Sequence, residues 1–247
     1  MHIVVVIPTY NEAENLPKLV SALFMLPLDL NILIVDDNSP DGTGRLADEL
    51  AATHSGKLSV MHRTNKQGLS SAYLQAFATL VDSNFDAIAQ MDADFSHDPG
   101  VLVEMAKCIE DCDVVLGSRY IPGGGTDLQW PLWRKGLSAW ANFYARTILQ
   151  MPFHDVTGGF RMWRRTTLQI MPLERVKASG YVFLIEMLFL AYCLKFKIGE
   201  TPIYFADRRW GKSKMSFKIQ VEAAVHVWQV WWSFRDLRKC KMQNEEG

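Results

Sequence analysis

The chain has 247 residues, of which 49% are hydrophobic and 21% are charged, and its formal net charge is -1. This balance is typical of one large globular domain, or of one domain with a small appendage. A net charge so close to zero argues against a general nucleic-acid-binding protein, so we expect no nucleic acid among its partners.

The first half of the chain alternates strand and helix patterns. The β-branched run Ile3–Ile7 is typical of a strand buried on both faces of a parallel sheet. Asn11 and Glu14 then fit a helix capping box, and apolar residues follow helical spacing from Leu16 to Phe24. The further strands expected here are 31–35, 58–62, one that begins at 87, and 114–118, with helices at 43–53, 68–81 and 101–109. This alternation predicts an α/β fold, in which a doubly wound, mainly parallel sheet carries helices on both faces.

The second half of the chain is less regular. Residues 119–126 contain three consecutive glycines, and this loop is either a lid over a site or an ordinary flexible connection. Residues 155–161 form a turn that opens another strand, and residues 198–205 form a last strand. The helices expected in this half are 133–149, 184–194 and 216–234.

Two acids one residue apart, Asp92 and Asp94, end the strand that begins at residue 87. Because strand side chains alternate, both acids should project to the same side at the C-terminal tip. Two carboxylates so close raise each other's pKa unless a cation lies between them, and a hard divalent cation with substrate phosphates suits such a pair. The alternative is a solvated loop that caps the next helix. Asp98 and Pro99 already fill the cap and first-turn positions, however, so a metal and diphosphate site is favoured.

Acids follow three of the early strands, and the carboxyl ends of parallel strands share one edge of the sheet. These acids are Glu12, the pair Asp36 and Asp37, and the pair Asp92 and Asp94. Neither a Gly-x-Gly-x-x-Gly turn nor a Walker A loop is present, so a nucleotide would be held by carboxylates and a metal. Tyr10, Asp36 and Asp37 suit base and ribose contacts, and the alternative is that the two acids only form the turn before Gly42.

Six short motifs, in this order along the chain, resemble those of family-2 glycosyltransferases. They are Pro8–Glu12, Val35–Asp37, Asp92–Asp94, Gly117–Tyr120, Thr157–Arg161 and Arg208–Lys214. More narrowly, they resemble the dolichol-phosphate (polyprenol-phosphate) mannose synthases, and the likeness covers residues 3 to about 230.

This resemblance implies a GT-A fold and a metal-dependent, inverting transfer that uses Mg²⁺ or Mn²⁺. The expected reaction moves mannose from GDP-mannose to a polyprenyl (dolichyl-type) phosphate. An alternative keeps the reaction with another nucleotide sugar, such as UDP-glucose. A non-catalytic sugar-nucleotide-binding protein is a different class. So is a nucleotidyltransferase, which typically has a glycine-rich basic loop after the first strand that this chain lacks.

The resemblance also assigns roles to residues by position. The residues that would contact the nucleoside are Pro8, Tyr10, Glu12, Val35 and Asp37. The residues that would hold the diphosphate and the metal, with Asp94 as the direct metal ligand, are Asp92, Ala93 and Asp94. The donor phosphates would be bound by Arg119, Arg208 and Lys214, and the acceptor phosphate by Arg119, Arg134 and Ser138. The residues expected to be catalytic are Asp94, Arg119, Arg134 and Arg208.

One departure from the family pattern concerns Ser96, because some members have at this position a Gln that can ligate metal. Serine is a weaker ligand, so a part for Ser96 in metal binding stays open. A phosphate monoester acceptor has a second pKa near 6 and arrives already anionic, so no dedicated general base is required. The arginines would offset the repulsion between an anionic acceptor and an anionic donor.

The C-terminal segment is expected to meet a membrane surface. An apolar face is formed by Phe217, Val221, Val225, Trp228, Trp231 and Trp232, and it is flanked by Lys218, Arg235, Arg238, Lys239 and Lys241. Such a helix suits a lipid interface, and the alternative is a helix packed on the sheet with solvated basic residues. We therefore expect a catalytic domain at 1–215 and an interfacial helix with a basic tail at 216–247. The protein would be cytoplasmic and peripheral on the cytosolic face of a membrane, with a membrane-anchoring partner subunit as a further option.

Overall fold

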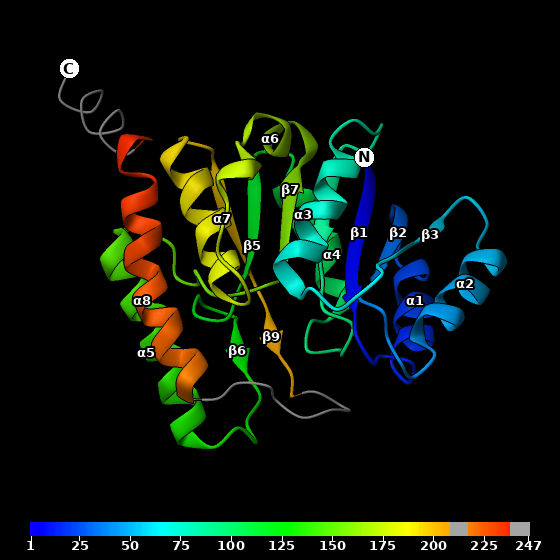
Figure 1. The fold of residues 1–247 in the computed structure, drawn as a ribbon, viewed down its shortest axis with the longest axis horizontal. Coiled ribbons are helices and arrows are strands. Elements are labelled where there is room, and N and C mark those ends of the chain that lie inside the picture. The colour runs from blue at the N-terminus through cyan, green and yellow to red at the C-terminus, as the bar shows by residue number, and fades with distance from the viewer. Residues whose placement is uncertain (208–216, 238–247) are drawn as a thin grey trace.

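The computed structural model describes residues 1–207 and 217–237, with the side chains of 217–223 excepted (Figure 1). Its centre is a seven-stranded sheet with the strand order β3-β2-β1-β4-β7-β5-β8. These strands are β1 (His2–Thr9), β2 (Asp29–Asp36), β3 (Leu58–His62), β4 (Ala87–Gln90), β5 (Val114–Ser118), β7 (Arg161–Arg164) and β8 (Ile198–Pro202). Strand β7 runs antiparallel to both of its neighbours, and the other pairs are parallel. The predicted, mainly parallel sheet is confirmed.

Helices cover both faces of this sheet. One face carries α1 (Leu16–Phe24), α2 (Thr43–Thr53) and α4 (Leu102–Cys108), preceded by the short turn η1 (Pro99–Val101). The other face carries α3 (Leu69–Leu80), α5 (Leu132–Leu149), α6 (Arg165–Ile170), α7 (Val182–Cys193) and α8 (Phe217–Ser233), with η2 (Leu173–Arg175) between α6 and α7. Strand β1 shows why both faces fill. Val4 and Val6 pack into the core with α3, whereas Ile3, Val5 and Ile7 pack into the core with α1.

Helix α7 is buried along nearly its whole length, as the apolar stretch around Glu186 predicts. The carboxylate of Glu186 is itself buried, and its Oε2 atom accepts hydrogen bonds from the backbone N of Lys177 at 3.0 Å and of Ala178 at 2.7 Å. Burial raises the pKa of Glu186 above its ordinary value, against the effect of these hydrogen bonds. The charge that interrupts the apolar run therefore anchors the loop before the helix.

The predicted capping box before α1 is wrong. The helix begins at Leu16, and Asn11 adopts a left-handed conformation with a φ of 62°. The cause lies in the loop after β2, which takes the backbone donors of this turn. The N–H of Glu12 donates to Oγ1 of Thr43 at 2.9 Å, and that of Ala13 donates to Oδ2 of Asp41 at 3.2 Å. These contacts hold residues 11–15 in a turn, so the helix begins only at Leu16.

The predicted strand 198–205 is divided in two. Strand β8 ends at Pro202, and β9 (Tyr204–Phe205) pairs instead with β6 (Gly125–Thr126) in a separate small sheet. This pairing holds the far end of the glycine-rich loop, and the N–H of Gly124 donates to the carbonyl of Ile121 at 2.9 Å. Both strands lie below the main sheet in Figure 1, near the end of β5.

Helices α5 and α8 lie side by side at one end of the molecule (Figure 1). The hydroxyl of Tyr144 on α5 donates to the carbonyl of Ala224 at 3.1 Å, and Nε1 of Trp228 on α8 donates to that hydroxyl at 3.0 Å. Among the residues that the structure describes, none of the helices combines the length and the apolar character that crossing a bilayer requires.

Candidate active site

The acidic pair lies in the loop that follows β4. The strand ends at Gln90, so strand alternation does not set the direction of Asp92 and Asp94, contrary to the reason given from the sequence. Asp94 is buried, and its Oδ1 atom accepts hydrogen bonds from the N–H of Ser96 at 3.0 Å and from its hydroxyl at 2.6 Å. Phe95 between them has a φ of 60°. Ser96 therefore orients the Asp94 carboxylate.

His97 closes this loop and was not assigned a role from the sequence. It is 1% exposed, and its Nδ1 atom accepts a hydrogen bond from the N–H of Asp92 at 3.2 Å. Burial lowers the pKa of His97 below its ordinary value, against the raising effect of Asp92 and Asp94. The neutral imidazole stacks on the ring of Phe160, with the ring centroids 4.8 Å apart. The acidic loop is thereby joined to the segment before β7.

The acids after β2 have internal partners. Asp36 accepts hydrogen bonds from Oγ1 of Thr9 at 3.1 Å and from Oγ of Ser39 at 2.6 Å, as the turn-forming alternative predicts. Asp37 forms an ion pair with Arg63, in which Nη1 and Oδ1 are 2.9 Å apart and both side chains are buried. Arg63 follows β3 directly, so its place at the same sheet edge could have been inferred from the sequence.

The other residues expected at the nucleoside lie along this edge. Pro8 and Val35 are direct partners in the β1–β2 register, and the Val35 side chain is fully buried. Oε2 of Glu12 accepts a hydrogen bond from Nδ2 of Asn15 at 2.8 Å. The Nζ atom of Lys66 lies 3.5 Å from the centroid of the Tyr10 ring. The structure therefore brings the ends of β1 and β2 together, and nucleoside contact by these residues stays a prediction.

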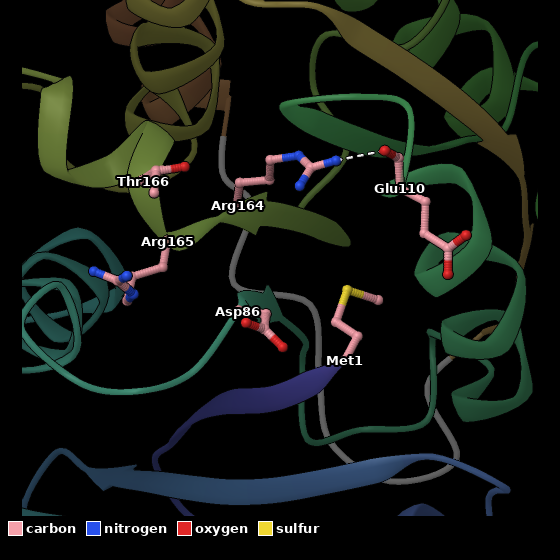
Figure 2. A pocket seen from close by; sticks show the side chains of 6 residues that line it. All are labelled: Met1, Asp86, Glu110, Arg164, Arg165 and Thr166. Carbon is pink, nitrogen blue, oxygen red and sulfur yellow. Dashed lines mark hydrogen bonds between the residues drawn. The ribbon is translucent and has the colours of Figure 1, made fainter.

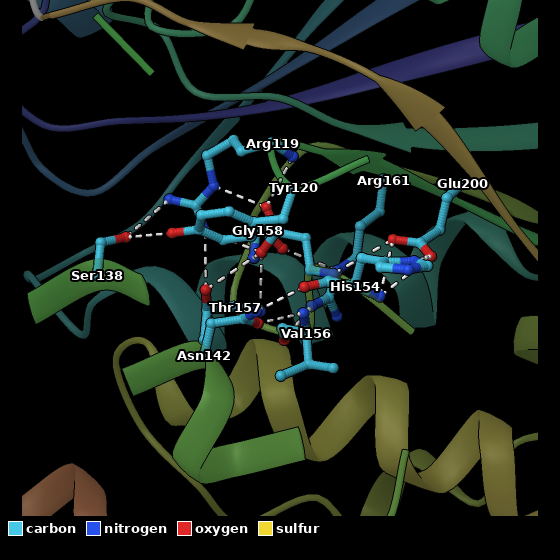
Figure 3. A network of polar contacts seen from close by, with 11 residues as sticks. Arg119, Tyr120, Ser138, Asn142, His154, Val156, Thr157, Gly158, Arg161 and Glu200 are labelled. Carbon is cyan, nitrogen blue, oxygen red and sulfur yellow. Dashed lines mark hydrogen bonds and ion pairs between the residues drawn. The ribbon is translucent and has the colours of Figure 1, made fainter. Parts of the chain in front are cut away.

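Arg119, just after β5, is the centre of a polar network (Figure 3). Its Nε and Nη2 atoms donate to the two oxygens of Asp155 at 2.7 and 2.8 Å, and Nη2 also donates to Oγ1 of Thr157 at 2.7 Å. Its Nη1 atom lies 3.5 Å from Oγ of Ser138, which is 2.9 Å from the Tyr120 hydroxyl. Burial opposes the charge of Arg119, but the Asp155 carboxylate raises the pKa of Arg119 above its ordinary value. The predicted neighbours Arg119 and Ser138 are thus in contact.

A second buried arginine, Arg161, lies beside this network (Figure 3). Arg161, the first residue of β7, donates to the carbonyls of Gly158 at 2.9 Å, of Val156 at 3.1 Å and of Leu184. Burial lowers the pKa of Arg161 to about 9, against the raising effect of Asp155. The hydrogen bonds to Val156 and Gly158 hold the turn that positions Asp155 against Arg119.

Phe205 of β9 connects the acids to the arginines. Its ring lies 5.4 Å from the His97 ring and 5.6 Å from the Trp130 ring, and the Arg119 guanidinium lies 5.6 Å from its centroid. The Arg134 guanidinium in turn lies 3.7 Å from the centroid of the Trp130 ring. The acidic loop and both arginines therefore border one aromatic cluster and do not lie on remote surfaces.

Arg134, at the start of α5, forms a partly exposed ion pair. Its Nη1 atom donates to Oδ1 of Asp207 at 3.0 Å, and 28% of its side chain is exposed. Arg134 and Ser138 are four residues apart on one helix and so share a face. Arg208 and Lys214, which were expected to bind the donor phosphates, lie outside the described residues.

The chemistry of the acidic loop fits a divalent cation that shares its ligands with a substrate. Within the described ranges, no group of three or more His, Cys, Asp or Glu residues is placed to hold a metal. Mg²⁺ and Mn²⁺ accept one or two carboxylates together with phosphate oxygens and water, which is what Asp92 and Asp94 can offer.

A separate hollow of about 360 Å³ lies at the opposite edge of the sheet (Figure 2). It is lined by Met1, Asp86, Glu110, Arg164, Arg165 and Thr166. Its two arginines bond to backbone carbonyls. Nε of Arg164 donates to Cys112, and Nε of Arg165 donates to Phe85. The hollow adjoins the start of β1 and the end of β7, so it is distinct from the acidic loop.

Two known proteins are similar to this chain over most of its length. A relative from Mycolicibacterium smegmatis, named polyprenol monophosphomannose synthase, is 44% identical over 213 residues, which cover 86% of this chain and 80% of the relative. A relative from Micrococcus luteus, named undecaprenyl-phosphate mannosyltransferase, is 40% identical over 227 residues, which cover 92% of this chain and 93% of the relative.

Solved structures show the same fold at low sequence identity. Glucosyl-3-phosphoglycerate synthase from Mycobacterium tuberculosis, in complex with Mn²⁺, uridine diphosphate and glucosyl-3-phosphoglycerate, has a TM-score of 0.63 at 18% identity and covers 94% of this chain and 78% of its own. Mannosyl-3-phosphoglycerate synthase from Rubrobacter xylanophilus has a TM-score of 0.65 at 17% identity, with coverages of 97% and 75%. Residues 4–170 match the family described as Glycosyl transferase family 2. The chain therefore belongs to glycosyltransferase family 2 and is a glycosyltransferase with the GT-A fold.

Proposed function

We propose that this enzyme transfers mannose from GDP-mannose to a polyprenyl phosphate, with inversion at the sugar carbon and with Mg²⁺ or Mn²⁺ bound. The observation that carries the proposal is the aromatic cluster around Phe205, which adjoins both the acidic loop and Arg119. A diphosphate sugar at the acids and a phosphate at the arginine would then be neighbours. The names of the two relatives support mannose as the sugar and a polyprenyl phosphate as the acceptor.

The donor would lie along the ends of β1, β2 and β4. Pro8, Tyr10, Glu12, Val35 and Asp37 would border the nucleoside. Asp92, Ala93 and Asp94 would face the diphosphate, and the bound cation would neutralise charge on the leaving diphosphate. Asp94 is held by Ser96, so its carboxylate needs no reorganisation to meet the cation.

The acceptor phosphate would lie between Arg119 and Ser138. Two of the three guanidinium nitrogens of Arg119 are committed to Asp155 and Thr157, which leaves the Nη1 edge toward Ser138 and Tyr120. A phosphate monoester can accept from this edge and from both hydroxyls. Because the acceptor oxygen is already anionic at neutral pH, none of these residues has to remove a proton.

Charge balance assigns a further role to Arg134. The pair of Arg119 with Asp155 is formally neutral, so it orients a phosphate more than it offsets repulsion between two anions. The ion pair of Arg134 with Asp207 is also formally neutral, but both side chains are partly exposed, at 28% and 48%, so a substrate phosphate could take the place of Asp207. With Arg208 and Lys214, Arg134 would supply the positive charge that the two substrates require.

The surface of α5 and α8 supports peripheral attachment to a membrane, where a polyprenyl acceptor would be found. The exposed large apolar residues on these helices are Leu132, Trp133, Trp140, Phe143, Val225, Trp228 and Trp232. The opposite side of α8 packs into the core through Val227 and Val230, as does Phe234 directly after the helix. The helix would therefore both pack on the protein and present tryptophans to the interface. The division at 215/216, the cytosolic location and an anchoring partner subunit remain parts of this proposal.

One experiment tests the reaction. Purified protein is incubated with Mn²⁺, a polyprenyl phosphate and labelled GDP-mannose, UDP-glucose or other sugar nucleotides in parallel. Transfer of label from GDP-mannose into the organic phase is the expected result. Transfer of label from UDP-glucose instead would show that the donor assignment is wrong, while the proposed mechanism of transfer to a polyprenyl phosphate would stand. If no donor is used even with membranes added, the proposed reaction fails for the chain on its own, which would favour a partner-dependent enzyme or a binding protein.

A further inference from the structure

The segment Arg63–Gly68 reaches across the edge of the sheet. Strand β2 separates β3 from β1 in the strand order. Nevertheless, the Nζ atom of Lys66, which follows β3, lies 3.5 Å from the centroid of the Tyr10 ring, which follows β1. The segment must therefore cross the carboxyl end of β2. It lies over the place where the proposed function puts the nucleoside.

Asp37 anchors this segment. Its Oδ1 atom accepts hydrogen bonds from Nη1 of Arg63 at 2.9 Å and from the N–H of Gln67 at 3.0 Å. Its Oδ2 atom accepts from the N–H of Gly68 at 2.8 Å and from that of Gln67 at 3.1 Å. Three donors therefore converge on one carboxylate, because the Gln67 N–H is shared between its two oxygens. Asp37 thus fixes the position of the segment.

Two further observations indicate that the segment is built for a ligand. Gly68 has φ 87° and ψ 178°, a conformation that is essentially restricted to glycine, and this fixes the direction in which the chain leaves Asp37. The Arg63 side chain is 2% exposed, and within the described part of the chain its Nε–H has no hydrogen-bond partner. Buried donors without an acceptor are rare in folded proteins. Arg63 therefore carries one donor that none of the described residues satisfies.

We infer that the Arg63–Gly68 segment forms one wall of the nucleoside subsite and that Lys66 is its specificity-determining residue. An ammonium group has three donors and no acceptor. On nucleotide binding, the Lys66 ammonium would leave the face of the Tyr10 ring and donate a hydrogen bond to a carbonyl oxygen of the nucleobase. Bases with an oxo group at that position would therefore bind more tightly than bases with an amino group at that position. This inference rests on the proposed function, in which guanine supplies the 6-oxo group.

Calorimetric titration of the full chain with Mn²⁺ tests the inference. The ligands are GDP and 2-aminopurine riboside diphosphate, which lacks the 6-oxo group. The wild-type protein should bind GDP about tenfold more tightly than the analogue, as expected for one charge-assisted hydrogen bond. Lys66→Met should weaken GDP binding about tenfold and bind both ligands equally, whereas Lys66→Arg keeps the preference. Lys57→Met, at the other end of β3, is the matched control and should bind as the wild type does.

Each outcome decides the inference. Unchanged GDP affinity and an unchanged preference in Lys66→Met would overturn it. Asp37→Asn should lose the preference as Lys66→Met does, and a retained preference would show that Asp37 is not the anchor. If the wild type binds UDP but not GDP, the donor assignment fails. Lys66 is then tested with UDP against CDP, which differ by a 4-oxo and a 4-amino group. If the wild type binds none of the four nucleotides, both the inference about Lys66 and the proposed function are overturned.

Discussion

Arg119 and Asp155 form a two-pronged ion pair, in which Nε and Oδ2 are 2.7 Å apart and Nη2 and Oδ1 are 2.8 Å apart. The Asp155 side chain has no exposed surface, and 9% of the Arg119 side chain is exposed. The backbone N–H of Arg119 also donates to Oδ2 of Asp155 at 3.1 Å. One carboxylate therefore sets both the position and the orientation of the arginine.

Replacing Asp155 with Asn should destabilise the protein and impair transfer together. Removing one partner of a buried pair costs about 3–5 kcal/mol, because the other charge stays buried without compensation. We expect this loss in the free energy of unfolding measured by urea denaturation, with a higher KM for the acceptor under conditions where the variant is folded. Asp29→Asn, which breaks an exposed pair with Lys57, is the control and should change neither quantity. Equal stability of Asp155→Asn and wild type would contradict the assigned role.

The same pair predicts how stability depends on pH. Burial opposes ionisation of Asp155, but the charge of Arg119 and its hydrogen bonds lower the pKa of Asp155 below the ordinary value of 3.8. The folded state thus holds the proton more weakly than the unfolded state does. The contribution of the pair is present above that ordinary value and is lost as the pH falls through the lower pKa of the folded protein. Urea denaturation of the wild type and Asp155→Asn between about pH 2 and 6 should show the difference shrinking toward acid. A difference that grows toward acid would have the wrong sign.

Ser96→Ala should raise the concentration of Mn²⁺ needed for transfer. The Ser96 hydroxyl orients the carboxylate of Asp94, and loss of such a supporting contact typically lowers metal affinity about 10- to 100-fold. Titration of activity with Mn²⁺ measures this, and excess Mn²⁺ should restore most of the rate. Ser55→Ala, on an exposed turn, is the control. An unchanged Mn²⁺ requirement would remove Ser96 from the metal site.

Asp94→Ala should abolish transfer without unfolding the chain. Asp94 is the proposed direct ligand, so no excess of Mn²⁺ should restore the rate, in contrast to Ser96→Ala. Circular dichroism and the melting temperature check the fold. Metal-dependent turnover by Asp94→Ala close to that of the wild type would rule out this assignment.

The tryptophans on α5 and α8 should carry membrane binding. Trp133 is 70% exposed and Trp232 is 56% exposed, so their replacement leaves the core intact. Each change to Ser should reduce partitioning onto anionic liposomes about tenfold, since a large apolar side chain contributes about 1.5–3 kcal/mol when it is fully buried. Met25→Ser, at an 83% exposed residue directly after α1, is the control. Flotation assays with equal partitioning of all variants would exclude this surface.

The sequence predicts most of the fold because its signals are local. The Ile3–Ile7 run and the helical spacing of Leu16 to Leu23 give β1 and α1 within a few residues. The insertion of β7 between β4 and β5 has no such signal, because strand order depends on pairing between distant segments. The Asn11 cap failed for the same reason, since Thr43 and Asp41 compete for that turn from another loop.

The candidate site divides in the same way. Asp92 and Asp94 could be selected because paired acids at the end of a strand suggest metal binding, whereas Arg119 was assigned through the family resemblance of the Gly117–Tyr120 motif. His97 and Phe205 could not, because their importance comes from touching each other across the fold. Arg63 was within reach, since it follows a predicted strand directly.

The antiparallel course of β7 has a mechanical consequence. Two ladders of backbone hydrogen bonds, one on each side of β7, hold β4 and β5 apart by roughly twice the inter-strand spacing of 4.8 Å. The spacing between the loops that follow β4 and β5 is thus set by main-chain geometry. In the reaction that we propose, side-chain substitutions at either loop would change how strongly a substrate is held, while the distance between the two loops would stay the same.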